Sequence, residues 1–410
     1  MLYNMKNMFC NDYELTTIDV SNFNTEKVED MGYMFGGCNK LNYINVSNFN
    51  TDKVKDMKYM FCNCYDLLSI DVSNFDTEKV LNMSYMFNGC NNLTNLNVSN
   101  FKTGNVKSMK YMFVNCFKIA FLDVSNFNTE KVEDMSYMFL GCNKLKSIDV
   151  SNFNTQNVIT MKYMFSNCFE LTSIDVYNFE TKKVEDMSYM FNLCINLIRI
   201  ESSYFNTQNV IDMSYMFNGC NKLKYLDVSY FDTENVKDMK YMFCNCFELT
   251  SIDLSNFITK NVKDMSFMFH GCYDLKLLDL SNFKTQKVKY MNDMFLHCTS
   301  LTSIDISNFN TENVLDMSYM FYNCQNLEKI DVSNFNTRNV YKMSEMFNHC
   351  VKLSYLDITS FRGDKLINET SYKKILYGIE NSINILKIHK SFYDKIKNEI
   401  PSNIPLLLYT

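Results

Sequence analysis

The sequence has few of the features that mark enzymes, membrane proteins or nucleic-acid-binding proteins. Of its 410 residues four are histidine and none is tryptophan, and no apolar run approaches the 18 residues of a membrane span. Residues 1–10 lack the apolar core of a secretory signal peptide. The formal net charge is -6, and residues 1–361 are more acidic than the tail, which argues against nucleic acid as the main partner.

Catalytic constellations are also missing from the sequence. The histidines are scattered and have no recurring acidic or thiol neighbour, so no His–acid or Cys–His pair is visible. They stand at His270, His297, His349 and His389. We therefore expect a protein that is not an enzyme and that has no catalytic residues and no cofactor.

The dominant feature of the sequence is a repeat. Phenylalanine recurs every 26 residues from Phe23 to Phe361 without insertion or deletion. A fixed period of this size predicts a solenoid, in which each unit buries its apolar face only against its neighbours. We expect about fourteen coils over residues 1–361, starting within a coil, and a C-terminal α/β capping segment over residues 362–410.

Each coil is expected to carry one short parallel strand and one short helix. The alternation of Ile148 and Val150 about Asp149 predicts a strand with two inward side chains. The spacing of Met161, Met164 and Cys168 indicates one face of a helix over about 161–167. The position before the first Met is usually Asp and in this coil Thr160, which is typical of a helix N-cap.

Three recurring residue types predict buried columns. Both Met positions are interpreted as core filler, because unbranched thioethers fit irregular gaps. For the Cys column, Cys38 through Cys350, a disulfide ladder, a metal site and buried free thiols are alternatives, and buried free thiols are preferred. The Asn column, for example Asn152, is expected to bind backbone groups of the adjacent coil.

The tail departs from the repeat after Phe361. Its pattern predicts helices over 371–379 and 391–400, the second capped by Ser391, with a strand over 383–388 between them. Pro401 and Pro405, which are the two prolines of the chain, end the last helix. We interpret the tail as a basic cap on an acidic array.

The pattern Leu-x-x-Ile-Asp-Val-Ser-Asn-Phe-Asn-Thr-x-x-Val-x-x-Met-x-x-Met-Phe-x-x-Cys resembles the 26-residue repeat of BspA-like leucine-rich-repeat surface proteins. The resemblance covers residues 2 to about 361. It implies a leucine-rich-repeat-like solenoid with parallel strands on one face, and a history of cell-surface display and of adhesion to host or matrix ligands. Phe153 occupies the common leucine-rich-repeat Asn position, which implies a bend geometry of its own.

The outward side chains of the predicted strands form two columns. One is acidic, with Asp149 as an example, and is expected to bind cations or basic partners or to raise some of its own pKa values. Calcium along this column is a weaker possibility than a solvated acidic face. The other column, two residues earlier, varies from coil to coil, as a recognition surface requires.

The ligand-binding prediction rests on the variable column and on the coils where the pattern breaks. The break includes Ser202, Tyr204 and Tyr230, and we expect the loosest coil there. The candidate ligand-binding residues are Tyr177, Arg199, Glu201 and Tyr225, with Phe121 and Leu277 in the same face.

Two functions are compatible with these patterns. The first is a non-enzymatic binding or adhesion module that presents the strand face to protein or glycan ligands at the cell surface. The second is an intracellular protein–protein scaffold in a reducing compartment, which the unpaired-looking cysteines and the missing signal favour. Neither involves nucleic acid or a membrane span.

Overall fold

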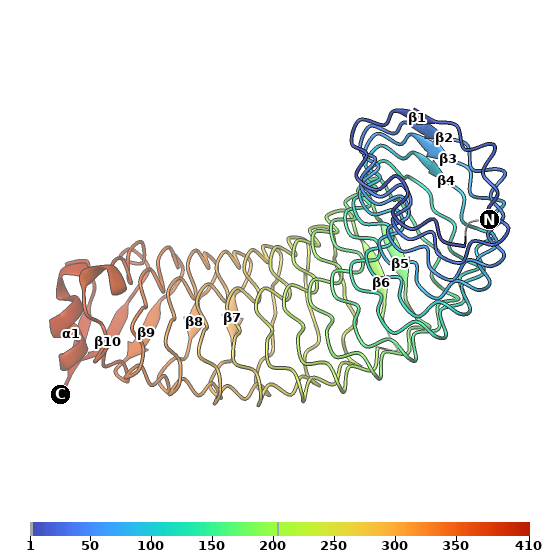
Figure 1. Cartoon of the computed structure of the whole chain (residues 1–410). Helices are drawn as coiled ribbons and strands as arrows, with labels where there is room; N and C mark the ends of the chain where they lie inside the picture. Colours follow the sequence, from blue (N-terminus) through green and yellow to red (C-terminus); the bar gives the residue numbers. More distant parts are fainter. Residues whose placement is uncertain (1–2, 203–204) are drawn as a thin grey trace. The chain divides into compact units, whose positions relative to one another are not determined.

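The computed structural model describes residues 3–202 and 205–410 and confirms the solenoid (Figure 1). The chain forms two compact units, residues 1–206 and 207–410. Within each unit, successive 26-residue coils lie parallel and in register, as the Cα partners Ile18 and Ile44 or Ile304 and Ile330 illustrate. Every strand pairing is parallel, as the repeat predicts.

The strands of the coils are short because each coil contributes only a few extended residues before the chain bends. In the first unit they are β1 (Thr17–Ile18), β2 (Tyr43–Ile44), β3 (Ser69–Ile70), β4 (Asn95–Leu96), β5 (Ser173–Asp175) and β6 (Arg199–Glu201). In the second unit they are β7 (Ser303–Ile304), β8 (Lys329–Ile330) and β9 (Tyr355–Ile358). We call the outward side of these strands, with the equivalent positions of the other coils, the strand face.

The core consists of the columns that the repeat predicts. Met161, Met164, Phe165 and Cys168 are fully buried, and their equivalents in neighbouring coils are buried in the same way. The Phe165 ring stacks on Phe139 with centroids 5.4 Å apart. Because each column packs against its own copy in the next coil, the core is continuous along each unit.

The helix predicted in each coil is wrong. Residues 161–168 form successive turns, in which Met164 N donates to Met161 O and Cys168 N donates to Phe165 O. Tyr163 and Asn167 have φ values of 57° and 60°, a left-handed conformation that a right-handed α-helix cannot contain. Their amides donate to the next coil instead, at Ser188 O and Asn192 O.

The chemistry predicted for the helix N-cap nevertheless occurs in these turns. Asp186 Oδ1 accepts hydrogen bonds from Ser188 N at 2.8 Å and from Ser188 Oγ at 2.6 Å. The same bond satisfies a free amide at the start of a helix, so the sequence pattern does not distinguish the two structures.

The cysteine alternatives are decided in favour of buried free thiols. None of the sixteen cysteines, all of which lie in the described residues, forms a disulfide, and the thirteen column members are buried. Twelve of the column thiols donate to a backbone carbonyl of the preceding coil; Cys168 Sγ, for example, lies 3.3 Å from Phe139 O. Burial raises the pKa of Cys142 and of Cys194 to about 12, which makes these thiols unreactive.

The Asn column binds backbone groups of the adjacent coil, as predicted. Asn152 Nδ2 donates to Ser125 O at 3.0 Å, and Asn178 Nδ2 donates to Ser151 O at 2.9 Å. These bonds satisfy carbonyl groups that the bend after each strand leaves open.

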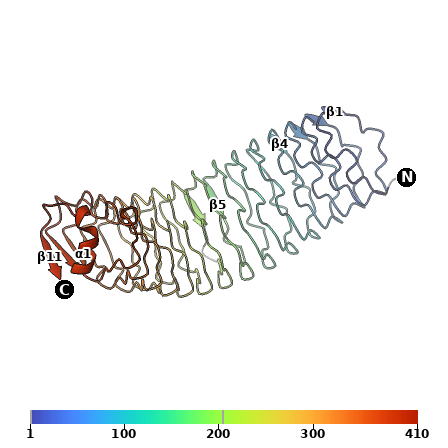
Figure 2. The same cartoon turned by 60° about the vertical axis from the view of Figure 1, so that its left-hand side comes forward.

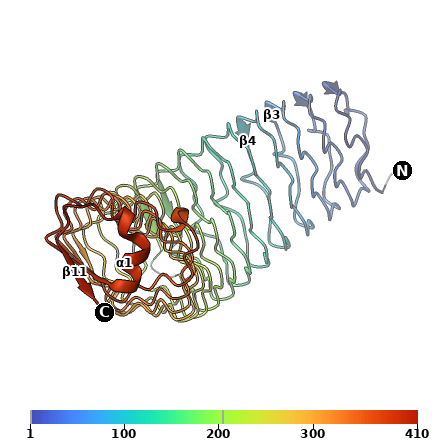
Figure 3. The ribbon, with the colours of Figure 1, turned by 90° about the vertical axis from the view of Figure 1, so that its left-hand side faces the viewer.

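The C-terminal residues close the second unit with a different arrangement. The elements are η1 (Glu369–Ser371), β10 (Ile385–His389), α1 (Lys390–Ile396), η2 (Lys397–Glu399) and β11 (Leu406–Tyr409). β10 pairs in parallel with both β9 and β11, so the sheet of the last coil continues into the cap (Figure 1). β11 and α1 lie at the C-terminal end of the second unit (Figures 2 and 3). β10 thus extends the strand face by one further strand.

The predictions for the tail are partly correct. The strand over 383–388 corresponds to β10, and the last helix corresponds to α1 followed by η2. The helix predicted over 371–379 is wrong, because residues 372–378 form turns after the short η1. The N-cap of α1 is His389 and not Ser391, since the His389 side chain accepts a hydrogen bond from Ser391 N.

Candidate functional site

The acidic column of the strand face is held by a turn that repeats in coil after coil. Asp149 Oδ1 accepts hydrogen bonds from Ser151 N at 3.0 Å and from Ser151 Oγ at 2.6 Å. Asn97 in the same column makes the equivalent bonds with Ser99. The side chain at this position therefore shapes the end of the strand whether it is charged or neutral.

The expectation that crowding raises pKa values in this column is wrong for the carboxyl groups with a resolved shift. Hydrogen bonds from the serine two residues later hold their pKa values below the ordinary value of 3.8, because such bonds favour the charged form. These groups are Asp19, Asp71, Asp149, Asp253, Asp279 and Asp305. These six carboxyl groups are therefore ionised at neutral pH.

The hydrogen bonds of the turn leave serine and carboxylate oxygens on the strand face that can accept further hydrogen bonds. In the Asp149 and Asp305 turns the serine hydroxyl donates its proton to the carboxylate, so its oxygen presents lone pairs to solvent. The carboxylate is an acceptor as well. A ligand for this face must consequently bring hydrogen-bond donors.

The variable column is exposed in the described coils and carries large apolar side chains. Phe121 is 72% exposed, Leu277 68% and Tyr225 67%. Exposed aromatic residues at isolated positions are ordinary anchors of interfaces. The column thus combines a constant backbone with side chains that differ from coil to coil.

The predicted ligand patch is only partly brought together by the structure. Arg199 and Glu201 lie on β6 and form an ion pair. Tyr177 follows β5 and lines a hollow of about 440 Å³ with Lys182 and Asn206. Tyr225 and Leu277 belong to the second unit, and Tyr204 lies outside the described residues. The patch as a binding site stays a prediction.

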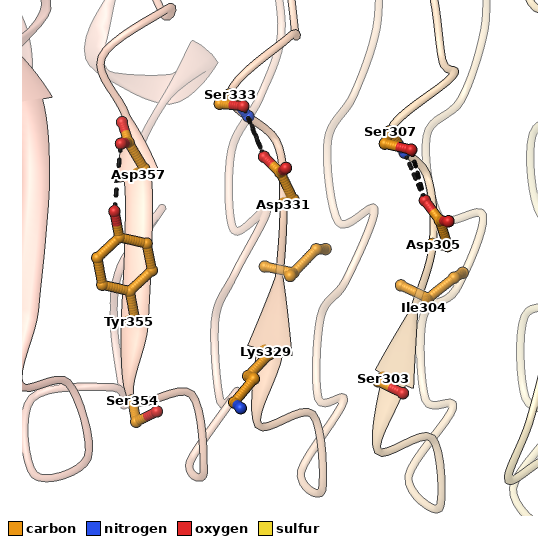
Figure 4. Close-up of a pocket in the computed structure, with 11 residues that line it drawn as sticks. Ser303, Ile304, Asp305, Ser307, Lys329, Asp331, Ser333, Ser354, Tyr355 and Asp357 are labelled. Atoms are coloured by element: carbon orange, nitrogen blue, oxygen red, sulfur yellow. Dashed lines mark hydrogen bonds between the residues drawn. The ribbon is translucent and has the colours of Figure 1, made fainter. Parts of the chain in front are cut away.

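Three further hollows lie on the strand face itself, each beside an aromatic side chain of the variable column. In the first unit one of about 320 Å³ lies beside Tyr43 and one of about 460 Å³ beside Phe121. In the second unit a hollow of about 760 Å³ lies beside Tyr355 (Figure 4). Asp71 and Ser69 line the Tyr43 hollow, and three aspartates of the acidic column together with serines line each of the other two.

The hollow beside Tyr355 contains an internal partner for one of its carboxylates. Asp305, Asp331 and Asp357 line it in successive coils. Tyr355 Oη donates to Asp357 Oδ2 at 3.3 Å, and Lys387 Nζ lies 3.8 Å from the same oxygen (Figure 4 shows the tyrosine–aspartate bond). Lys387 Nζ also lies over the Tyr355 ring, 5.3 Å from its centroid.

Comparison with known proteins identifies the family. The chain matches the family described as "Mycoplasma protein of unknown function, DUF285" over residues 2–69, 64–173, 115–204, 194–302 and 269–381. The chain belongs to this family. The narrower resemblance to BspA-like surface proteins stays a prediction. No match was found among curated proteins.

The solved structures that are similar to this DUF285 chain include leucine-rich-repeat proteins. One, titled as a TLR13–ssRNA13 complex, has 13% identity and a TM-score of 0.26, and the match covers 96% of this chain and 73% of that one. A Leptospira interrogans leucine-rich-repeat protein has 10% identity, a TM-score of 0.23 and coverage of 96% and 93%. The functional domain of InlJ from Listeria monocytogenes has 13% identity and a TM-score of 0.24, and the match covers 92% of this chain and 74% of that one.

A tyrosine ladder is the main feature of this DUF285 chain that the sequence interpretation missed. In the first unit it comprises the tyrosines of the Met-x-Tyr-Met motifs. The ring centroids of tyrosines in neighbouring coils lie 4.1 to 4.7 Å apart. Its members are Tyr33, Tyr59, Tyr85, Tyr111, Tyr137, Tyr163 and Tyr189. Burial raises the pKa of Tyr111 and of Tyr163 to about 12. Their 26-residue spacing could have revealed this ladder, as it revealed the Met columns.

Within residues 3–202 and 205–410, no group of three or more His, Cys, Asp or Glu side chains could hold a metal ion. No helix in the same ranges is long and apolar enough to cross a membrane.

Proposed function

We propose that this chain is a non-enzymatic binding module that presents its strand face to protein or glycan ligands at the cell surface. The observation that carries the proposal is the set of hollows beside Tyr43, Phe121 and Tyr355, where exposed aromatic rings adjoin acceptor groups. A constant scaffold that varies only at outward positions meets the requirements of a recognition surface.

The binding part of the proposal can be tested with purified chain and a panel of extracellular matrix proteins and glycans. We expect saturable binding to at least one member of the panel. Replacing Phe121 with Ala should weaken that binding, whereas Ile159→Ala should not, since Ile159 is 45% exposed but lies outside the strand face. The absence of saturable binding, or equal losses in both variants, would contradict the proposal.

The location is tested separately in intact source cells. A non-penetrating protease and a non-penetrating biotin label should cut or tag the chain if it is displayed at the surface. If the chain is untouched in intact cells but cut in a lysate, the alternative holds, and the same face serves an intracellular protein–protein scaffold.

A further inference from the structure

The hollows beside Tyr43 and Phe121 arise from a size difference between neighbouring coils. Phe121 projects from one coil, while the next two coils carry Ser147 and Ser173 at the same position. Tyr43 is likewise followed by Ser69 and Asn95. A large ring beside two short side chains leaves a depression with the ring as its wall, and both depressions lie in the first unit.

The floor and rim of the Phe121 hollow combine apolar and anionic groups. Leu122, Ile148 and Ile174 are buried beneath it, and Asp123, Asp149 and Asp175 lie along its edge. The ring is 72% exposed, and in the described residues no cation lies over it. The hollow thus offers the face of an aromatic ring together with three carboxylates.

In the second unit a lysine of the chain itself lies against an aromatic ring and a carboxylate of the strand face. Lys387, from β10, lies over the Tyr355 ring and within 3.8 Å of Asp357 Oδ2. Tyr355 and Asp357 occupy the same positions in their coil as Phe121 and Asp123 in theirs. The chain therefore contains an internal example of a cationic side chain bound between ring and carboxylate.

We propose that the Phe121 and Tyr43 hollows bind arginine or lysine side chains of an extended basic segment in a partner protein. This inference rests on the proposed function and specifies its ligand. A flat guanidinium group can stack on the ring and donate to the carboxylates at once. A neutral sugar could donate to the carboxylates, but it would leave the negative charge of the face without compensation.

The spacing of the two hollows sets the spacing of the basic residues. Tyr43 and Phe121 are three coils apart, or about 14 Å at about 4.8 Å between parallel strands. An extended peptide advances about 3.3 Å per residue and places every second side chain on one face. Two basic residues separated by four positions therefore span about 13 Å on one face, which matches the hollows.

The test uses the full chain and fluorescent peptides of glycine and serine that carry two arginines. One peptide has the arginines at i and i+4, a second has them at i and i+3, and a third has glutamines at i and i+4. We expect the i+4 peptide to bind about tenfold more tightly than the i+3 peptide and the glutamine peptide not to bind. Its affinity should fall as salt is added.

Variants identify the hollow as the binding site. Phe121→Ala should weaken binding of the i+4 peptide about five- to tenfold and abolish its preference over the i+3 peptide. Tyr13→Ala is the matched control, because Tyr13 is 53% exposed but does not line a strand-face hollow. Unfolding midpoints of both variants should equal that of the unmodified chain, since both side chains are exposed.

The outcomes of these experiments separate a failure of this inference from a failure of the proposed function. If both arginine peptides bind equally and Phe121→Ala has no effect on them, the basic ligand is wrong. If Phe121→Ala still weakens binding to a matrix protein or glycan, the proposed function survives that result with another ligand class. If the variant changes no binding at all, the strand-face function fails as well.

Discussion

At the scale of single residues, the left-handed turn position before each column cysteine restricts which residue a coil can carry. Asn115 and Gly141 occupy this position in neighbouring coils with φ values of 57° and 74°. A Cβ atom on Gly141 would lie 2.6 Å from Asn115 Oδ1, closer than van der Waals contact allows. In this pair of coils the asparagine leaves no room for a Cβ atom at Gly141, whereas Asn167 and Asn323 are followed by Leu193 and His349.

We predict that Gly141→Ala lowers the free energy of unfolding by about 2 kcal/mol or more, through the left-handed backbone and the contact with Asn115. Urea unfolding measures the change. Gly104→Ala is the control, because its Cβ would meet only the end of the Asn128 side chain at 3.3 Å. In the double variant Asn115→Gly with Gly141→Ala the cost should be smaller. Equal losses for Gly141 and Gly104 would refute this explanation.

Cysteine reactivity gives a second prediction at this scale. Cys10 is partly exposed, whereas the other fifteen cysteines are buried. Because the thiolate is the reactive form and burial raises the pKa of these thiols, iodoacetamide should modify one cysteine quickly in the folded chain. All sixteen should react after unfolding. Mass spectrometry counts the adducts, and fast modification of several column cysteines in folded protein would show that the core is looser than described.

At the scale of the structural element, the tyrosine ladder has an interruption in the second unit. Tyr241 stacks on Phe267 with centroids 4.2 Å apart, and the next member of the column is Asp293. Burial raises the pKa of the Asp293 carboxyl to about 6, because its charged form is poorly solvated there. At neutral pH this carboxyl is mostly ionised. It occupies the position at which an aromatic ring would complete the ladder between Phe267 and Tyr319.

We predict that Asp293→Asn stabilises the protein at neutral pH and not in acid. Below its ordinary pKa of 3.8 the Asp293 carboxyl is protonated in both the folded and the unfolded chain, so it does not lower the stability of the wild-type protein at that pH. As pH rises from about 4 to about 6 the unfolded chain releases the proton first, and the wild-type protein loses stability that the variant retains. Chemical unfolding from pH 4 to 8 measures the difference, which should reach on the order of 1 kcal/mol. A difference that is independent of pH would contradict the assignment.

Asp293→Tyr extends the same comparison to the ladder. A ring at this position should add about 0.5–1.5 kcal/mol for each aromatic contact beyond the gain of the asparagine variant. If both variants are equally stable, ring stacking does not contribute there.

At the scale of the whole molecule, asparagine and glycine alternate over several successive coils at the turn position before the column cysteine. Asn63, Gly89, Asn115 and Gly141 alternate in the first unit, and Asn245 and Gly271 repeat the pattern in the second. At Gly89, Gly141 and Gly271 a Cβ atom would lie 2.5 to 2.6 Å from the asparagine Oδ1 of the preceding coil, so alanine does not fit there without a shift. The alternation ends where Leu193 follows Asn167 and where His349 follows Asn323.

Calcium binding, the weaker of the two interpretations of the acidic column, is tested at this scale. Carboxylates are hard oxygen ligands, so calcium that binds along the column should raise the melting temperature of the chain. The experiment compares millimolar calcium with the same ionic strength of sodium chloride. A melting temperature that is equal in both salts would leave the column as a solvated acidic face.

Much of the fold could be predicted from the sequence because each coil repeats the environment of its neighbours. The buried positions of Met161, Phe165 and Cys168 follow from their recurrence alone. The candidate site was only partly predictable. Phe121 was named as part of the face, but its hollow depends on the short side chains at Ser147 and Ser173, which are 26 and 52 residues away.

The sequence by itself determined the period, the parallel stacking and the identity of the core columns, since these depend on residue type at a fixed spacing. Only the tertiary structure decided the backbone of residues 161–168. Spacings of three, four and seven suit one face of a helix, but they also suit two successive turns with left-handed residues at Tyr163 and Asn167. The turns form because their amides bind carbonyls of the next coil, a partner that no local pattern contains.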